Sequence, residues 1–229
     1  LIVGSLSMTG LSGTLVNDLL SIAGDDVGLL LLMGALTSFV LGIGMTVTAA
    51  YIFLAVVLAP ALVSQDLDPL SVHLFILYWA MLSYITPPVA LGAYAAASIA
   101  GANPLKTGFA AMTMGSVIYV IPFIFVLDPG FILKSDTLSS MQVVLEALIG
   151  VWLICGGLQG FLSGYGRLNH YLVRVAVAVG GLMIALPYMG IAWPEAPANT
   201  VHLMIGLVLA VVGVLANRVF FRRDPPIAL

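Results

Sequence analysis

Long apolar runs dominate the chain, and short segments rich in polar residues, glycine or proline separate them. A hydrocarbon core of about 30 Å needs about 20 helical residues, so the runs divide into full spans and shorter ones. They do not alternate polar and apolar residues as the strands of a membrane barrel would. The pattern therefore predicts an all-α polytopic membrane protein. Helices are predicted at residues 27–41, 71–85, 89–101, 105–127, 138–163, 168–187 and 199–221, with a short amphipathic helix at 11–23.

A first interruption is predicted at residues 42–48, where the sequence is GIGMTVT. Glycine weakens a helix and β-branched residues disfavour it, although the apolar pattern resumes immediately afterwards. We therefore predict one broken, discontinuous helix over residues 27–64. Four residues of the interruption are expected to supply backbone or hydroxyl oxygen atoms: Gly42, Gly44, Thr46 and Thr48.

A second interruption is predicted at Thr86-Pro87-Pro88. Each proline disfavours helical geometry in the residue before it. The flanking segments, residues 71–85 and 89–101, would be about 22 Å and 20 Å long as helices, so neither comfortably crosses a bilayer. A single kinked helix of about 45 Å is the alternative. We favour a re-entrant hairpin over residues 71–101 that turns at the two prolines, with Asp68 or Ser71 capping its first arm.

Irregular backbone at membrane depth is tolerated only where it is buried in protein or lines a wet cavity. An arm that ends at the turn presents carbonyl groups that suit a cation, and an arm that begins there presents N–H groups that suit an anion. Hard oxygen ligands favour sodium, and neither interruption contains a titratable residue. The predicted ion ligands are Gly42, Gly44, Thr46, Thr48, Ser83, Thr86 and Pro87. The predicted substrate contacts are Thr48, Thr86, Pro88, Val89 and Tyr94.

Composition supports this picture, because 62% of residues are hydrophobic, 7% are charged and the mean hydropathy is +1.17. The net charge of −3 is too weak and too scattered for a nucleic-acid partner. One cysteine cannot form a disulfide within the chain. Counting basic residues by loop predicts that one side, the cytoplasmic one, carries Lys106, Arg167, Arg174, Arg218, Arg222 and Arg223, with Lys134 on the opposite side.

Two broken elements that meet near the midplane are typical of secondary transporters. A channel also uses broken helices, and a non-transporting membrane assembly subunit would pack them dry, so both stay open as alternatives. An enzyme is not expected, because the chain has no Gly-x-Ser-x-Gly sequence and no paired intramembrane aspartates.

Two stretches resemble a known family: GIGMTVTAAYIFLAVVLAPALV and HLFILYWAMLSYITPPVALGAYAAASIAGANPLKTGFAA. Both are similar to the second half of the large permease subunit of tripartite ATP-independent periplasmic (TRAP) transporters, and the chain resembles the fused type that is associated with TAXI binding proteins. The resemblance covers about residues 1–130. Residues 131–229 resemble the extra C-terminal helices less distinctively. The family commonly has proline and threonine where Thr46 and Val47 stand, which is a departure at the first interruption.

The resemblance implies an elevator-type transporter, of which this chain would hold the second inverted repeat. It also implies a prokaryotic cytoplasmic (inner) membrane location, sodium as the coupling ion and no other cofactor. The implied partners are a periplasmic substrate-binding protein, a small membrane subunit, separate or fused N-terminally, and a small organic acid as the substrate. The chain is then expected to be part of a longer protein.

Overall fold

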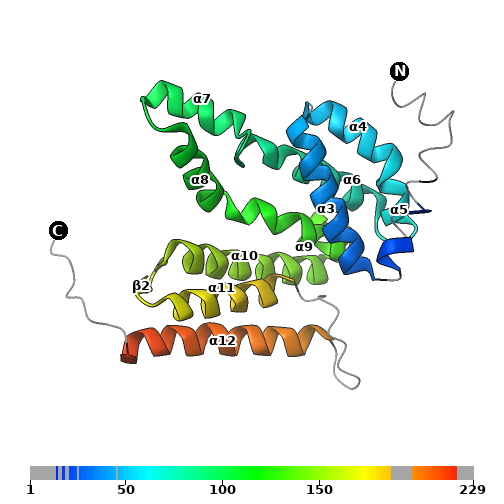
Figure 1. Cartoon of the computed structure of the whole chain (residues 1–229). Helices are drawn as coiled ribbons and strands as arrows, with labels where there is room; N and C mark the ends of the chain where they lie inside the picture. The colour runs from blue at the N-terminus through cyan, green and yellow to red at the C-terminus, as the bar shows by residue number, and fades with distance from the viewer. Residues whose placement is uncertain are drawn as a thin grey trace. The chain divides into compact units, whose positions relative to one another are not determined.

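The computed structural model describes residues 14, 17–18, 21–24, 26–44, 46–186 and 198–220. The described chain is built almost entirely from helices (Figure 1). It divides into two compact units, Leu1–Ser140 and Met141–Leu229, which are called the N-terminal and C-terminal units below. The sequence placed its division at residue 130. Residues 1–10 and much of the amphipathic helix predicted at 11–23 lie outside the described residues.

The N-terminal unit contains short helices separated by breaks. The α-helices are α3 (Val27–Gly44), α4 (Val47–Val57), α5 (Ala59–Val63), α6 (Pro69–Met81), α7 (Leu91–Ala100), α8 (Pro104–Met114) and α9 (Ile121–Leu127), and the 3-10 helices are η1 (Leu82–Tyr84), η2 (Ser116–Tyr119) and η3 (Pro129–Ile132). Helix α6 lies at the centre of the core: its residues Phe75, Ile76 and Ala80 are fully buried, and α3, α4 and α9 pack against it.

The two interruptions differ from the prediction in how they turn the chain. Helix α4 turns back from the end of α3, and both helices pack against α6 (Figure 1). Helix α7 leads away from the end of α6, and it packs against η1 and α8. The two arms of the hairpin predicted over residues 71–101, α6 and α7, therefore do not pack closely along each other. The chain instead reverses direction between α3 and α4, within the broken helix predicted over residues 27–64. Prolines end a helix, but packing against a third element decides the direction in which the chain continues.

The single helix predicted at residues 105–127 is wrong. Helix α8 ends at Met114, and the following segment, η2 with α9, is bent from it by 66°. Gly115 accounts for the position of the bend: a Cβ atom there would lie 2.9 Å from the Ile85 side chain and 3.1 Å from the Ala111 carbonyl oxygen. A third broken element therefore lies beside the α6–α7 break.

The C-terminal unit is a set of long helices with one small hairpin. Its elements are α10 (Thr137–Gln159), which begins in the N-terminal unit, β1 (Phe161–Leu162), β2 (Gly166–Arg167), α11 (Tyr171–Ala185) and α12 (Ala198–Phe220). The helix predicted at 138–163 stops earlier, because Gly160 has a positive φ of 73°. Glycine lets the helices approach closely. A Cβ atom added at Gly150 would lie 2.6 Å from the carbonyl oxygen of Gly181, and one added at Gly180 would lie 2.7 Å from the carbonyl oxygen of Gly206. Such contacts between small residues are typical of helix packing in lipid.

By length and composition, two of the described helices can each cross a membrane: Thr137–Gln159 and Val201–Val219. The bent pair α8 and η2–α9 makes a third candidate if it counts as one span. The other apolar helices of 10–17 residues are too short to cross alone. Short apolar helices joined at breaks are consistent with the predicted polytopic membrane protein.

Candidate functional site

The α6–α7 break leaves backbone groups unpaired on both sides. Among the described residues, none donates a backbone hydrogen bond to the carbonyl oxygens of Ile85, Pro87 or Pro88. Ala90, the N-cap residue of α7, has a left-handed φ of 36° and makes no side-chain cap hydrogen bond. The carbonyl groups carry partial negative charge and the first N–H groups of α7 carry partial positive charge. The break therefore offers oxygen ligands and amide donors within a few residues.

Thr86 connects the α6–α7 break to the bend between α8 and η2. Its side chain is 6% exposed, and its hydroxyl oxygen lies 2.5 Å from the hydroxyl oxygen of Tyr119 in η2. The ring of Tyr119 also packs edge-on against Trp79 of α6, with the ring centroids 6.1 Å apart. The predicted site residue Thr86 is thus fixed by an aromatic residue that follows the bend at Gly115.

Gly42 brings the α3–α4 turn against the end of α6. A Cβ atom at Gly42 would lie 2.4 Å from the carbonyl oxygen of Ala80, so only glycine permits this approach. The same carbonyl accepts a hydrogen bond from the hydroxyl group of Ser83 at 3.0 Å. The structure therefore brings together two residues that the sequence placed in different interruptions, Gly42 and Ser83, at one carbonyl group.

The first interruption is narrower than predicted. Gly42 and Gly44 both belong to α3, and α4 begins at Val47 with Thr46 as its N-cap. The Thr46 hydroxyl accepts a hydrogen bond from the backbone N–H of Ala49 at 3.4 Å, and Thr48 is exposed on the first turn of α4. Gly42 is therefore a position of close packing and does not itself break the helix.

Apart from Thr48 in α4, the predicted substrate residues lie at the second break and on the helix that follows it. Pro88 is exposed and Val89 is half-buried, and both precede α7, which begins two residues later than predicted at Leu91. Pro87 and Tyr94 lie side by side at Gly108 of α8, where an added Cβ atom would come within 2.9 Å of Pro87 and 3.3 Å of the Tyr94 ring. Tyr94 thus faces α8.

Ser116 and Trp79 were missed from the sequence, whereas Tyr94 of the same region was predicted as a substrate contact. The hydroxyl groups of Tyr94 and Ser116 and the indole N–H of Trp79 are buried and have no hydrogen-bond partner in the described chain. Because η2 is a 3-10 helix, Ser116 and Tyr119 lie on one face of it. Gly115 and Pro122 were the available signals of a further break. No group of three or more His, Cys, Asp or Glu side chains among the described residues could hold a metal ion.

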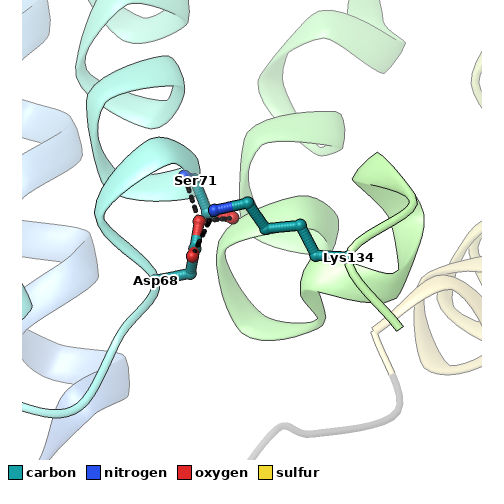
Figure 2. A network of polar contacts seen from close by, with 3 residues as sticks. All are labelled: Asp68, Ser71 and Lys134. Atoms are coloured by element: carbon teal, nitrogen blue, oxygen red, sulfur yellow. Dashed lines mark hydrogen bonds and ion pairs between the residues drawn. The ribbon is translucent and has the colours of Figure 1, made fainter. Parts of the chain in front are cut away.

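Asp68 fixes the other end of α6, as Figure 2 shows. Its carboxylate accepts hydrogen bonds from the backbone N–H and the hydroxyl group of Ser71, at 2.9 and 3.2 Å, and from the ammonium group of Lys134 at 2.6 Å. The prediction of Asp68 as a helix cap is confirmed. Partial burial acts to raise the pKa of Asp68, but the Lys134 and Ser71 contacts outweigh it and hold that pKa below its ordinary value of 3.8.

A lowered pKa makes a pH-dependent contribution to stability. Because the folded-state pKa of Asp68 is lower than the unfolded one, its contribution is complete above about pH 4 and is lost as the pH falls through the folded-state value. We expect Asp68→Asn to lower the thermal midpoint of the detergent-solubilised protein at pH 7, since the amide can still cap the helix but removes the charge that pairs with Lys134, a loss of up to about 1 kcal/mol. The difference between the variant and the parent should shrink below pH 4 in thermal unfolding scans. The matched control is Asp66→Asn in the same loop, and an equal loss in that variant would contradict the assignment.

Comparison with known proteins decides the family. The family model described as "Tripartite ATP-independent periplasmic transporter, DctM component" matches residues 1–136, which is more than half of the 229 residues. The chain belongs to this family. No curated protein and no solved structure matches the chain.

Membership makes the chain a TRAP transporter permease, and the predicted resemblance to the large permease subunit of TRAP transporters is confirmed. With its apolar helices, it is a multi-pass integral membrane protein. TRAP family membership implies a periplasmic binding protein and a small membrane subunit as partners. The matched range ends between η3 and α10, so both breaks and the bend at Gly115 lie inside it.

Proposed function

We propose that this permease is a sodium-coupled secondary transporter that imports a small organic acid delivered by a periplasmic substrate-binding protein. Family membership supports the transport role and the delivery step. The observation that carries the proposal is the α6–α7 break, where the carbonyl groups of residues 85, 87 and 88 and the amide groups of residues 91–93 have no backbone partner among the described residues. In a membrane each such group costs several kcal/mol unless a ligand or water satisfies it.

The coupling ion would bind at the carbonyl side of the break. Ser83 and Thr86 lie there, and the contact of Gly42 with Ala80 places the end of α3 beside them. Uncharged oxygen ligands from backbone and hydroxyl groups suit a hard monovalent cation. The α3–α4 turn would complete the set of ion ligands with Gly44, Thr46 and Thr48.

The acid would bind at the amide side. The first N–H groups of α7 carry the positive end of the helix dipole, which favours a carboxylate. Pro88 and Val89 lead into these groups, and Tyr94 follows one turn later. An elevator movement of this second-repeat region would carry the bound acid and ion, and we place the complete transporter, of the fused TAXI-associated type, in the inner membrane.

The test is uptake by the complete permease, reconstituted in proteoliposomes with its periplasmic binding protein. We expect labelled mono- or dicarboxylates to accumulate in a sodium gradient and not when potassium or choline replaces sodium. Thr86→Val should reduce uptake strongly, because it removes a hydroxyl ligand from the predicted ion site and leaves the half-buried Tyr119 hydroxyl without its partner. The matched control is Thr113→Val, since Thr113 is exposed and bonds only within its own helix. Uptake at the same rate in sodium, potassium and choline would contradict the proposal, and so would an equal loss of uptake in Thr86→Val and Thr113→Val.

A further inference from the structure

One end of the C-terminal unit carries three arginine residues and, among the described residues, no carboxylate. The end of α10, the β1–β2 hairpin, the start of α11 and the end of α12 meet there, and they carry Arg167, Arg174 and Arg218. In the described residues 141–186 and 198–220, Glu146 is the one carboxylate. It lies in α10, about 20 Å along the helix from Gln159. This end of the unit is therefore positively charged.

The β1–β2 hairpin pairs a cation with an aromatic ring. Phe161 lies opposite Arg167 in the antiparallel register, and both side chains are exposed while Leu162 is buried. Opposite residues in such a pair extend from the same face of the hairpin. The side chains of Phe161 and Arg167 therefore point together away from the helices.

Asn217 brings a second arginine to the hairpin. Its side chain is 2% exposed, and its amide N–H group donates a hydrogen bond to the carbonyl oxygen of Arg167 at 3.0 Å. Its side-chain oxygen accepts a hydrogen bond from the backbone N–H of Asn169 at 2.9 Å. Arg218, the next residue in α12, is exposed. Arg167 and Arg218 thus extend from two segments that a buried side chain holds together.

The third arginine has a structural task. The guanidinium group of Arg174 donates hydrogen bonds to the carbonyl oxygens of Gly157, at 3.0 Å, and of Leu158, in the last turn of α10. It therefore satisfies and neutralises the end of α10. Among the described residues, neither Arg167 nor Arg218 forms an ion pair. These two side chains are available for an anion outside the chain.

Exposed apolar residues lie in the same segments, in the β1–β2 hairpin and at the start of α11. Phe161 is 55%, Tyr171 74% and Leu172 68% exposed. The predicted spans Thr137–Gln159 and Val201–Val219 both end here, so this surface lies at the level of the lipid headgroups. Aromatic residues at that level anchor membrane proteins, and arginine beside them meets the phosphate groups.

We propose that Arg167 and Arg218 bind the phosphate group of an anionic phospholipid, with the ring of Phe161 beside the acyl chains. Charge complementarity selects an anion, and the apolar surroundings select a lipid over a soluble phosphate. Arginine also suits phosphate oxygens because of its planar, forked donors. The site lies in the part of the chain beyond residue 136, outside the family match, so it is independent of the proposed transport site.

The experiment measures lipid retention by native mass spectrometry of the complete protein, released from nanodiscs of phosphatidylcholine with one-fifth phosphatidylglycerol. We expect the parent protein to retain phosphatidylglycerol preferentially. Arg167→Gln and Arg218→Gln should each weaken retention about fivefold, since each basic residue near an anionic surface contributes about that factor. The double variant should lose the preference altogether.

The controls separate this site from general charge and from free phosphate. Lys106→Gln removes an exposed cation from the N-terminal unit and should leave retention unchanged. Inorganic phosphate added to the detergent-solubilised protein should not displace the lipid at millimolar concentration. Equal effects of Lys106→Gln and Arg167→Gln, displacement by inorganic phosphate, or no preference in the parent protein would overturn the proposal. Thermal unfolding in phosphatidylcholine alone checks that the variants fold.

Discussion

Gly42→Ala is expected to abolish uptake while the helix that carries the substitution still forms. Alanine is favoured over glycine in a helix by about 1 kcal/mol, so helix propensity alone predicts a gain in stability. The added Cβ atom would lie 2.4 Å from the Ala80 carbonyl oxygen and 3.0 Å from the Ala80 Cα atom. Backbone atoms cannot move aside as a side-chain end can, and overpacking costs about 1–3 kcal/mol. The repulsive contact should therefore outweigh the gain and separate the α3–α4 turn from the end of α6.

Gly28→Ala is the matched control for this prediction, because Gly28 lies in the same helix and its nearest obstacle is a flexible carboxylate, Asp26, at 3.2 Å. Proteoliposome uptake and thermal unfolding should be measured for both variants. We expect Gly28→Ala to retain uptake. If Gly42→Ala transports as well as Gly28→Ala, the close approach of α3 to α6 has no part in transport.

The pair Pro87→Ala, Pro88→Ala is expected to remove uptake as well, by a different route. Each proline in a helix interior costs about 3 kcal/mol, so the pair opposes a continuous helix from α6 to α7. Two alanines restore two N–H donors and allow helical geometry. In the continuous helix, the amides of residues 89, 91 and 92 would then donate to the carbonyl groups of residues 85, 87 and 88 that the break leaves open, and the proposed ion ligands would be lost.

The control for the proline pair is Pro104→Ala with Pro129→Ala. Both of these prolines occupy the first turn of a helix, where proline interrupts nothing. We expect this second pair to transport normally. Circular dichroism of both proteins should show added helix only for the Pro87 and Pro88 variant. Unchanged uptake in that variant would remove the break from the mechanism.

Both interruptions could be located from the sequence because their causes are local. Proline has no N–H and glycine weakens a helix, so residues 86–88 and the region of Gly44 were correctly identified as helix ends. The direction of the chain after each break could not be predicted, because it depends on contacts between α6 and the helices around it. The same holds for Gly42, which lies inside α3 and permits a tertiary contact.

The hydrogen bond between Thr86 and Tyr119 also could not be predicted from the sequence. Tyr119 lies 33 residues away, in a segment read as the middle of one long helix, and only the bend at Gly115 brings it to the break. By contrast, the cap at Asp68 was predictable because its partner Ser71 is three residues along the chain. Local hydrogen bonds follow from spacing, whereas contacts between breaks follow from the packed fold.

The central claim is that the free backbone groups of the α6–α7 break hold the ion and the acid. Hydrogen–deuterium exchange of a peptide covering residues 82–93, in the reconstituted permease, tests it most directly. We predict rapid exchange at Leu91, Gly92 and Ala93 in potassium, since none of the described residues accepts a backbone hydrogen bond from these amides. Exchange should slow when sodium and a transported acid are added together. Amides that are already protected in potassium, or that exchange identically in both salts with the acid present, would contradict the claim.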